Sequence, residues 1–563
     1  MKPDNKSLNY ILKSIPNYKI IIVIFIIIGV FLRFYDINWG APYYFNPDER
    51  NIASSINQLS FPFRMNPHFF AYGSLPIYTI YFLGVILNFI QNIFFHSPTQ
   101  NQILYLSFEK SIIIGRVISA SLSVILLLII YKTAVILKGK STGLIAIILS
   151  SISTGLIQYS HFGTFEIWLT LLSTLFFYFL LKYINHKNNK YFFLSILTLG
   201  LLVSVKISSL ALIVIPCIAL IITTKNKYGF INVLKNVFLE SILIIIIVFA
   251  CFVIFSPYSI IDYQSFRSSI LYESSVAMGT LHVFYTDGFY NTVPVIFQFL
   301  KVYPFLINPI LTLLFLPTMI FFIYETITKK DSNKILLLIF FFVLFFSQAF
   351  LFVKWTRYML PTLPFIYLII STELSNFIPV FSNKKKFILL IKYLVLGIIL
   401  ISSIVNCISF FITVYAQKDT RVLAAEFAKN NIPYNAKILS EVYDLGIVPF
   451  NSTLNNIALF NFYDLDNGNN LNENGLYSNL NNYKYIILPS QRILRSRLLN
   501  PNIFPRGYKF YNNLINEKSG YRIIYSTPCD ILCKITYINN PIWGLEETAY
   551  VFDRPSIYIF KKM

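Results

Sequence analysis

Long stretches of this chain consist almost entirely of apolar residues, and short polar connections separate them. A run such as "KIIIVIFIIIGVFLRFY" is long enough to cross a bilayer as a helix, because about 18 consecutive apolar residues span its hydrocarbon core. The pattern predicts a polytopic α-helical membrane protein with about eleven transmembrane helices. The predicted spans are residues 19–35, 112–137, 143–159, 165–181, 191–205, 208–224, 236–256, 304–323, 335–353, 358–379 and 387–415.

Alternate connections between these spans are rich in lysine. Lys and Arg are enriched in cytoplasmic loops, so these connections indicate the orientation of the chain. We expect a multi-pass protein of the cell membrane, with its N-terminus in the cytoplasm and its C-terminal part extracytoplasmic. The lysines are Lys2, Lys6, Lys13, Lys19, Lys138, Lys140, Lys182, Lys187, Lys190, Lys225, Lys227, Lys235, Lys329, Lys330, Lys334, Lys384, Lys385 and Lys386.

One apolar run, residues 75–95, conflicts with this orientation. If it spanned the membrane, every later Lys-rich loop would face outward. We therefore place it in the first outer loop, lying on the membrane or dipping into it, and its Asn88, Gln91 and Asn92 favour an interface over a lipid core. A hairpin partner within residues 96–111 would preserve the orientation equally well.

Residues 416–563 form a different kind of sequence, polar and without a spanning run. "TRVLAAEFAKNNIPYNAKILSEV" predicts a helix, a turn and a strand, and "YKYIILPS", "GYRIIYST" and "YVFDRPSIYIFKK" predict further strands. About 148 residues suffice for a small α/β domain with its own core. We expect two domains, a transmembrane module over residues 1–415 and an extracytoplasmic soluble α/β domain over residues 416–563.

Three details of the tail lead to smaller predictions. "SQRILRSRLL" groups Arg492, Arg495 and Arg497, which we interpret as a solvated surface patch in preference to a headgroup- or acceptor-binding site. "NGNNLNENG", residues 467–475, has the composition of a flexible surface loop. Cys529 and Cys533 are spaced for a tight disulfide, although a reduced pair fits the spacing almost as well.

Composition supports the membrane assignment. The 563 residues are 56% hydrophobic and only 13% charged, whereas about 25% is usual in soluble domains. The net charge of +21 would suggest nucleic acid in a soluble protein. Here the lysines follow the predicted membrane topology, so we expect no nucleic-acid partner. Cys217, Cys251 and Cys407 lie within spans and are expected to pack as small apolar residues.

The outer connections hold most of the candidate chemistry. Asp48 and Glu49 stand side by side in a first outer loop, residues 36–111, directly after the first span. Four further outer connections place ionisable residues at span ends, where such groups usually face a protein cavity. These residues are Arg116, His161, Glu166, Lys206, Lys354 and Arg357. Together they predict a polar cavity that opens outward, whereas Glu273 and Asp287 are interpreted as ordinary charges in water.

Two acids and several cations suit glycosyl transfer from a lipid phosphate. A carboxylate can take the proton of the attacking hydroxyl, while Arg and Lys stabilise the phosphate that leaves. One base and several cations predict a single displacement with inversion at the sugar carbon. Adjacent carboxylates can also hold a divalent metal, and the sequence leaves that role open.

Several short segments resemble a known family. "FNPDE", "YGSLPIY", "GRVISA", "SHFGTFEIWLT", "GLLVSVKISSL", "SPYSIIDYQSF" and "RYMLPTLPF" are similar, in this order, to segments of GT-C fold membrane glycosyltransferases of the dolichyl-phosphate-mannose protein mannosyltransferase-like branch. The resemblance covers about residues 20–380. It implies a polyprenyl-phosphate-linked sugar donor, carrying mannose or a similar hexose or pentose, and a protein, glycolipid or glycan acceptor among the membrane lipids.

The resemblance also implies roles for individual residues. Asp48 matches the catalytic acid of the family, and Glu49 matches its supporting neighbour. Arg116 matches a residue near the lipid phosphate, and Lys206 and Arg357 match basic positions of similar context. Glu166 stands where many relatives carry Asp.

A transporter or flippase of a lipid-linked or anionic substrate is the alternative. The charges gather at one face instead of the midplane, and the spans show no internal repeat, which favours the enzyme.

Overall fold

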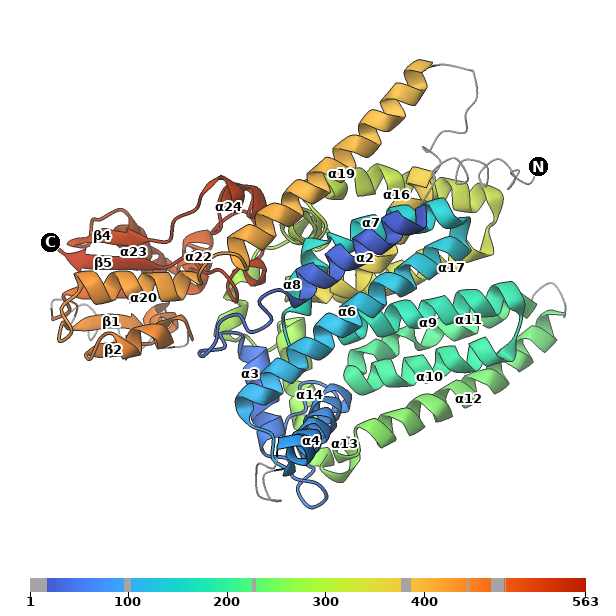
Figure 1. Cartoon of the computed structure of the whole chain (residues 1–563), viewed down its shortest axis with the longest axis horizontal. Coiled ribbons are helices and arrows are strands. Elements are labelled where there is room, and N and C mark those ends of the chain that lie inside the picture. Colours follow the sequence, from blue (N-terminus) through green and yellow to red (C-terminus); the bar gives the residue numbers. More distant parts are fainter. Residues whose placement is uncertain are drawn as a thin grey trace.

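The computed structural model describes residues 18–95, 103–224, 229–375, 386–442, 445–466, 480 and 482–563. Figure 1 shows two parts, a bundle of long helices and a smaller region containing the sheet that lies at one end of the bundle. In the first half of the chain the helices are α2 (Tyr18–Phe34), α3 (Pro47–Asn57), α4 (Leu75–Phe95), α6 (Phe108–Lys138), α7 (Lys140–Ser151), α8 (Thr154–Ser160), α9 (Glu166–His186), α10 (Asn189–Val205), η1 (Ile207–Ile213), α11 (Val214–Thr224), α12 (Phe230–Phe255), α13 (Tyr258–Ile261) and α14 (Tyr263–Met278).

The second half of the bundle begins after α14. Its elements are the short helical turns η2 (Phe284–Phe289) and η3 (Gln298–Val302), then α15 (Tyr303–Leu306), α16 (Pro309–Lys329), α17 (Ser332–Ala349), η4 (Thr356–Thr362), α18 (Leu363–Leu374) and α19 (Lys386–Val414). Neighbouring pairs such as α9 and α10, α10 and α12, and α6 and α9 pack against one another. One large apolar core runs through these helices.

The described part of each predicted span is largely helical, although several spans are broken. The span predicted at 143–159 is split into α7 and α8, which meet at a bend of 56°. The span predicted at 358–379 begins with the tight turn of η4. By length and apolarity alone, eight helices within the described residues could cross a membrane, or nine if the bent pair is one span. α2 and α10, each of 17 residues, fall just below that length.

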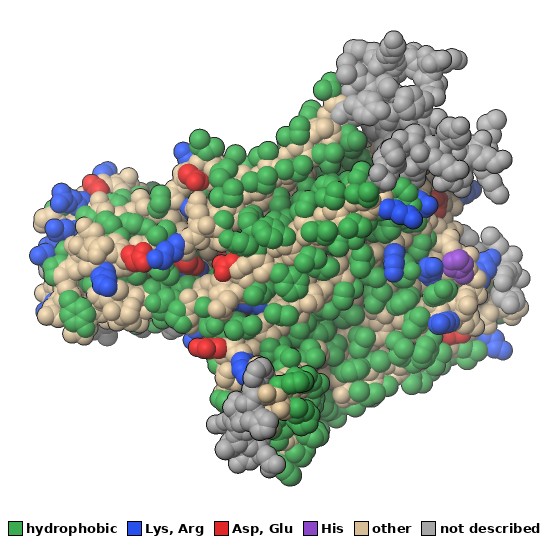
Figure 2. Space-filling view, viewed as in Figure 1, with side chains coloured by type: hydrophobic (Ala, Val, Ile, Leu, Met, Phe, Trp, Pro, Cys, Tyr) green, Lys and Arg blue, Asp and Glu red, His purple; other side chains and the backbone are tan. Residues whose placement is uncertain are grey.

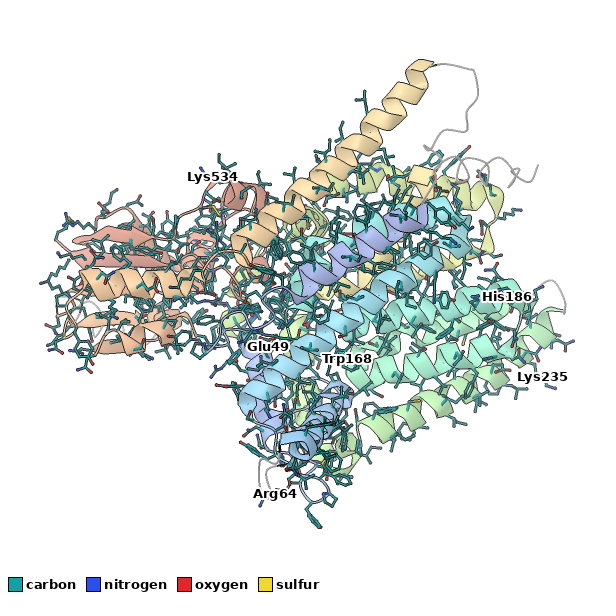
Figure 3. The ribbon with its side chains drawn as sticks, in the orientation of Figure 1. Glu49, Arg64, Trp168, His186, Lys235 and Lys534 are labelled. Atoms are coloured by element: carbon teal, nitrogen blue, oxygen red, sulfur yellow. A yellow bond between two sulfur atoms is a disulfide. The ribbon has the colours of Figure 1, made fainter. Side chains whose placement is uncertain are left out.

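The surface matches a membrane protein. Figure 2 shows apolar side chains over the outward faces of the helices, with Lys and Arg gathered at the end of the bundle away from the sheet. Figure 3 places His186 and Lys235 at that end and Glu49 toward the other. Within the described residues the Lys-rich connections therefore share one end, as a single membrane orientation requires.

α4 differs from the spans in its direction. Figure 1 shows it nearly end-on, whereas α6 and α12 lie along the page. Its Asn88 amide donates to the carbonyls of Ile103 and Tyr105 at 3.2 and 3.0 Å, and Lys110 donates to Asn88 and Gln91. Large apolar side chains cover its other face. By length and apolarity α4 is also one of the eight candidate spans, so the placement of residues 75–95 at the membrane surface stays a prediction.

The C-terminal region folds around a five-stranded sheet in the order β2-β1-β3-β5-β4. β1 pairs in parallel with β2 and β3, and β5 pairs antiparallel with β3 and β4. The sequence predicted four of these strands and missed β2. The elements are α20 (Thr420–Asn431), β1 (Ile438–Glu441), η6 (Leu445–Ser452), β2 (Ile457–Phe460), η7 (Phe462–Asp466), β3 (Tyr485–Leu488), α22 (Arg492–Leu499), α23 (Pro505–Ile515), β4 (Tyr521–Ser526), α24 (Ile531–Thr536), η8 (Glu547–Ala549) and β5 (Tyr558–Lys562).

The prediction that the arginines of "SQRILRSRLL" form a solvated surface patch is wrong for two of the three. Arg495 and Arg497 are buried. Arg497 donates to Asp287 of the bundle at 2.6 Å, and Arg495 donates to the Leu545 carbonyl at 2.8 Å. Asp287 is likewise buried and is not the solvated charge that we expected. The pair of Arg497 and Asp287 helps to hold the sheet domain against the bundle.

The cysteines follow the predictions where these were definite. Cys529 and Cys533 form a disulfide across the start of α24, with 5.2 Å between their Cα atoms. Cys251 and Cys407 are buried within spans, and Cys217 is half-buried. The loop predicted at 467–475 lies outside the described residues.

Candidate active site

The acidic doublet opens a helix. Asn46 caps α3, and its side-chain oxygen accepts hydrogen bonds from the backbone amides of Asp48 and Glu49 at 3.0 and 3.3 Å. Pro47 occupies the first turn, where its missing amide hydrogen costs nothing. Two adjacent residues on a helix point in different directions. The doublet therefore sends one carboxylate into the protein and the other toward a cavity.

Glu49 points inward and is buried together with Arg116 of α6. The two form a bidentate ion pair, with both N–O distances 2.8 Å, and the Gly163 amide donates to the same carboxylate at 2.6 Å. Arg116 also donates to the carbonyls of Ile37 and Trp39.

The guanidinium of Arg116 thus donates its hydrogen bonds to groups of the protein itself. The predicted place of Arg116 near the donor phosphate is not favoured by this geometry. Glu49, expected as the supporting neighbour of Asp48, is engaged with Arg116. Removing one partner of a buried ion pair typically costs about 3–5 kcal/mol. We assign both residues to positioning α3 on α6.

Asp48 points the other way and forms an ion pair with Arg357 of η4. Both side chains are partly accessible, 20% for Asp48 and 15% for Arg357. They line a cavity of about 330 Å³ between the bundle and the sheet domain. Its walls combine aromatic rings with a few charges, and they comprise Pro47, Asp48, Asn51, Phe69, Ala71, Tyr72, Glu273, Phe284, Tyr285, Trp355, Arg357, Arg492, Thr548 and Phe552. We call this the outer cavity.

Glu273 lines this cavity, although the sequence analysis interpreted it as an ordinary charge in water. It belongs to α14 and lines the wall shared with Asp48 and Arg357. Burial raises the pKa of its carboxyl, while the charges of Arg357 and Lys206 act against that rise. Glu273 lies in an outer connection rich in polar residues, so its sequence context resembles that of any solvated acid.

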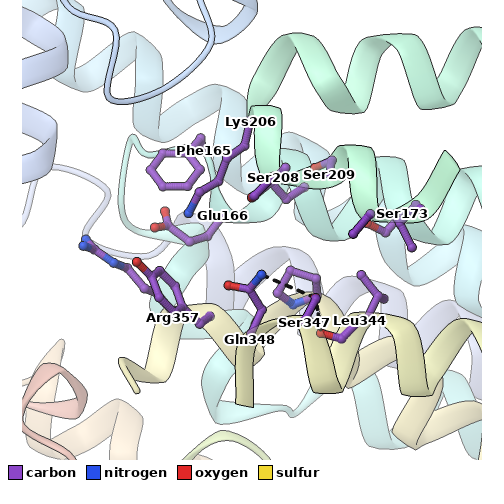
Figure 4. Close-up of a pocket in the computed structure, with 15 residues that line it drawn as sticks. Phe165, Glu166, Ser173, Lys206, Ser208, Ser209, Leu344, Ser347, Gln348 and Arg357 are labelled. Atoms are coloured by element: carbon purple, nitrogen blue, oxygen red, sulfur yellow. Dashed lines mark hydrogen bonds between the residues drawn. The ribbon is translucent and has the colours of Figure 1, made fainter. Parts of the chain in front are cut away.

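Arg357 also reaches a second, narrower cavity inside the bundle (Figure 4). This cavity, of about 50 Å³, is lined by Glu166 of α9, Lys206 at the end of α10, and polar residues such as Ser209 and Gln348. The Lys206 ammonium lies over the rings of Phe165 and Tyr358, at 5.2 and 4.7 Å. We call this the inner slot. Three of the predicted residues, Glu166, Lys206 and Arg357, therefore meet.

Two predicted residues lie elsewhere. The ring nitrogens of His161 each lie 2.9 Å from a backbone carbonyl, those of Ile157 and Tyr35, and its buried ring stacks on Tyr415. Lys354 is buried and donates to the Phe352 carbonyl at 2.9 Å. Neither lines the outer cavity or the inner slot. Both are better explained as structural residues than as substrate ligands.

The sheet domain fixes the segment that carries Arg357. The Glu546 carboxylate accepts hydrogen bonds from the Thr356 amide and hydroxyl, at 2.9 and 2.7 Å. Arg492 of α22 lines the outer cavity and is paired with Glu547 at 2.9 Å. The tail is therefore part of the cavity wall.

The acids are not grouped as a metal site in the described part of the chain, where no three His, Cys, Asp or Glu side chains gather suitably. Asp48 and Glu49 instead diverge, and each faces an arginine.

Known proteins resemble this chain in part of its sequence and in its fold. Residues 101–260 match the family model described as dolichyl-phosphate-mannose-protein mannosyltransferase. The structure resembles that of the Archaeoglobus fulgidus oligosaccharyltransferase in its apo form, with a TM-score of 0.50 and 12% identity over 97% of this chain and 88% of that one. ArnT from Cupriavidus metallidurans bound to undecaprenyl phosphate matches with a TM-score of 0.45 and 9% identity over 84% of this chain and 93% of that one. No curated protein matches the chain.

Proposed function

We propose that this chain is a membrane glycosyltransferase of the GT-C fold that moves a hexose or pentose such as mannose from a polyprenyl-phosphate donor to an acceptor hydroxyl. The reaction takes place in the outer cavity, at the extracytoplasmic face of the membrane. The acceptor belongs to a protein, a glycolipid or a glycan. The N-terminus is cytoplasmic, and residues 416–563 form an extracytoplasmic domain.

The observation that carries the proposal is the place of Arg357. Its side chain lines both the outer cavity and the inner slot, and it is paired with Asp48. Its Nε is buried without a hydrogen-bond partner among the described residues. A lipid phosphate at this junction would receive donors from Arg357 and positive charge from Lys206. Its sugar would extend into the outer cavity.

In this arrangement Asp48 is the general base. The Arg357 guanidinium pairs with the Asp48 carboxylate and holds it at the wall of the outer cavity. As the acceptor oxygen attacks the anomeric carbon, its proton passes to Asp48, and the bond between that carbon and the phosphate oxygen breaks. The electron pair stays on the phosphate, which Arg357 and Lys206 stabilise. Attack from the face opposite the phosphate inverts the anomeric carbon.

The position of these groups also bears on the transporter alternative. Asp48 and Arg357 lie at the end of the bundle that contacts the sheet domain, and a transporter would hold its substrate near the middle of the spans. We therefore favour the transferase.

The test replaces Asp48. Asp48→Asn keeps the shape of the side chain and removes its basicity, so transfer from polyprenyl-phosphate mannose to membrane acceptors should fall about 10²–10⁴-fold. Undecaprenyl phosphate should still bind. The control Glu109→Gln changes an exposed acid of the same loop and should transfer at the wild-type rate. A folded Asp48→Asn protein with near-normal transfer would rule out the base.

A further inference from the structure

A separate groove opens far from the outer cavity, between α16, α18 and α19. It has a volume of about 660 Å³ and mostly apolar walls, within the usual range of protein ligand pockets. Leu314, Thr318 and Phe321 contribute from α16, and Ile370 and Val395 from the helices opposite. None of its lining residues belongs to the outer cavity or the inner slot.

Two of the helices that form the groove, α16 and α19, are joined by a hydrogen bond near the sheet domain. Near the sheet domain, Asn308 beside α16 donates to Ser403 of α19 at 2.9 Å. Toward its first residues α19 projects away from the bundle (Figure 1). The side chains of Phe321 and Tyr324 line the groove and are also largely exposed on the apolar outer surface. The groove is thus open sideways to the bilayer.

The end of the groove away from the sheet domain is charged. Glu325 accepts from Lys329 and Lys334, and Lys334 also reaches Glu373 at 3.3 Å. Lys138 donates to the Thr372 carbonyl beside them at 2.8 Å. Three lysines face two glutamates, so the cluster carries an excess of one positive charge, and Lys329 is 66% exposed.

We propose that this groove binds a phospholipid with an anionic headgroup. The acyl chain lies along the apolar walls between α16 and α19, and the phosphate lies at Lys329. Apolar length with one cationic end at the membrane surface matches that class of lipid. The bilayer that surrounds these helices contains phospholipid and can supply the ligand. The site is distinct from the proposed donor site, and it does not depend on the transferase proposal.

The test measures which lipid the purified protein retains. The protein is incubated in detergent with equal amounts of dioleoyl-phosphatidylglycerol and dioleoyl-phosphatidylcholine, and bound lipid is counted by native mass spectrometry. These two lipids share their acyl chains and differ in headgroup charge. We expect one retained lipid per chain, with phosphatidylglycerol preferred.

Two pairs of variants locate the site. Thr318→Trp fills the groove and should lower lipid retention about tenfold. Its control is Ile320→Trp, because the Ile320 side chain is 71% exposed and lies outside the groove. The control should retain lipid as the wild type does. Lys329→Gln should reduce the preference for phosphatidylglycerol about fivefold, the effect of one basic residue near an anionic lipid. Lys330→Gln is its matched control.

Three results would overturn the proposal. They are equal retention of the two lipids, wild-type retention by a folded Thr318→Trp protein, and an unchanged headgroup preference in Lys329→Gln. If Thr318→Trp does not fold, Lys329→Gln decides alone, because its exposed side chain can be replaced without disturbing the core.

Discussion

At the scale of single residues, Asp48 and Glu49 show how one step along a helix separates two roles. The Glu49 side chain is 1% exposed, and an arginine and a backbone amide satisfy it. The Asp48 side chain is 20% exposed and lines the outer cavity. Both acids are paired with arginine, so pairing alone does not distinguish them. Access to the cavity does, and it makes Asp48 the candidate that can meet a substrate.

A second carboxylate leads to a prediction about pH. Burial raises the pKa of Asp553 to about 7, although the amide of Gln158 donates to it at 2.9 Å. The folded protein therefore binds this proton more tightly than the unfolded chain does, and stability should fall as the pH rises from about 4 to 7 and then level off. Asp553→Asn cannot lose a proton and should flatten the pH dependence of Tm and raise Tm at pH 8.

Thermal unfolding of the purified protein, followed by intrinsic fluorescence between pH 5 and pH 8, checks this expectation. The control Glu426→Gln alters a half-exposed acid of the same domain and should keep the wild-type slope. The same slope in Asp553→Asn would contradict the assignment.

Residue-scale chemistry was only partly predictable. Asp48, Lys206 and Arg357 could be proposed because charges beside apolar runs are unusual. Glu273 could not, because an acid in a polar loop carries the same signal whether or not it lines a cavity. His161 and Lys354 also stand beside apolar runs, yet their side chains hydrogen-bond to backbone carbonyls. The partner of a buried polar group lies far away in the chain, so sequence alone does not identify it.

At the scale of elements, the segment before α4 positions part of the outer cavity. Gly73 donates its amide to the Val205 carbonyl at 2.9 Å, and the next residue, Ser74, donates to Ser256 at 3.1 Å. The preceding residue, Tyr72, lines the cavity and packs its ring 3.7 Å from that of Phe165. The backbone contact at Gly73 thus fixes the place of an aromatic wall.

That contact leaves no room for a side chain. A Cβ atom at Gly73 would lie 2.0 Å from the Ser204 carbonyl oxygen, and the backbone would have to move. Gly73→Ala should cost about 1–3 kcal/mol of stability and should lower transfer as Tyr72 shifts. Gly397→Ala in α19 meets nothing within 4 Å and is the control. Urea unfolding and a transfer assay measure the two effects, and an unchanged Gly73→Ala protein would show that the contact is not needed.

Elements with a strong pattern were predictable and irregular ones were not. The long apolar runs identified the helices, and β-branched and aromatic residues identified four strands. β2 is as short as β1 and β3, but asparagines, which are depleted in strands, stand directly on both sides of it. The break between α7 and α8 is equally hidden, because Ile152 and Ser153 interrupt the helix without a glycine or proline to mark it.

At the scale of the whole molecule, the two ends differ in charge and partners. The sheet domain covers one end, and lysines gather at the other. Alternating loop charge made this division predictable before any contact was known. The docking of the sheet domain was not predictable, because it depends on pairs such as Asp287 with Arg497 and Thr356 with Glu546.

Labelling tests the proposed sidedness. Lys235→Cys and Lys518→Cys each place a thiol at an exposed position, the first at the Lys-rich end of the bundle (Figure 3) and the second in the sheet domain. An impermeant maleimide added to intact cells should label the second and spare the first. The native free cysteines lie within spans and should give a low background. The reverse pattern would overturn the orientation and the outward-facing site.

The hydrogen bonds from Thr356 to Glu546 join residues 190 positions apart in the chain. A ribosome adds about 5–20 residues per second, so roughly 10–40 s of synthesis separate the two. During that interval the bilayer already holds the earlier helices, while the segment bearing Arg357 lacks its clamp. In the proposed transferase, the segment bearing Arg357 would therefore reach its working position only after the tail has been made, and a chain terminated before Glu546 would lack transfer activity.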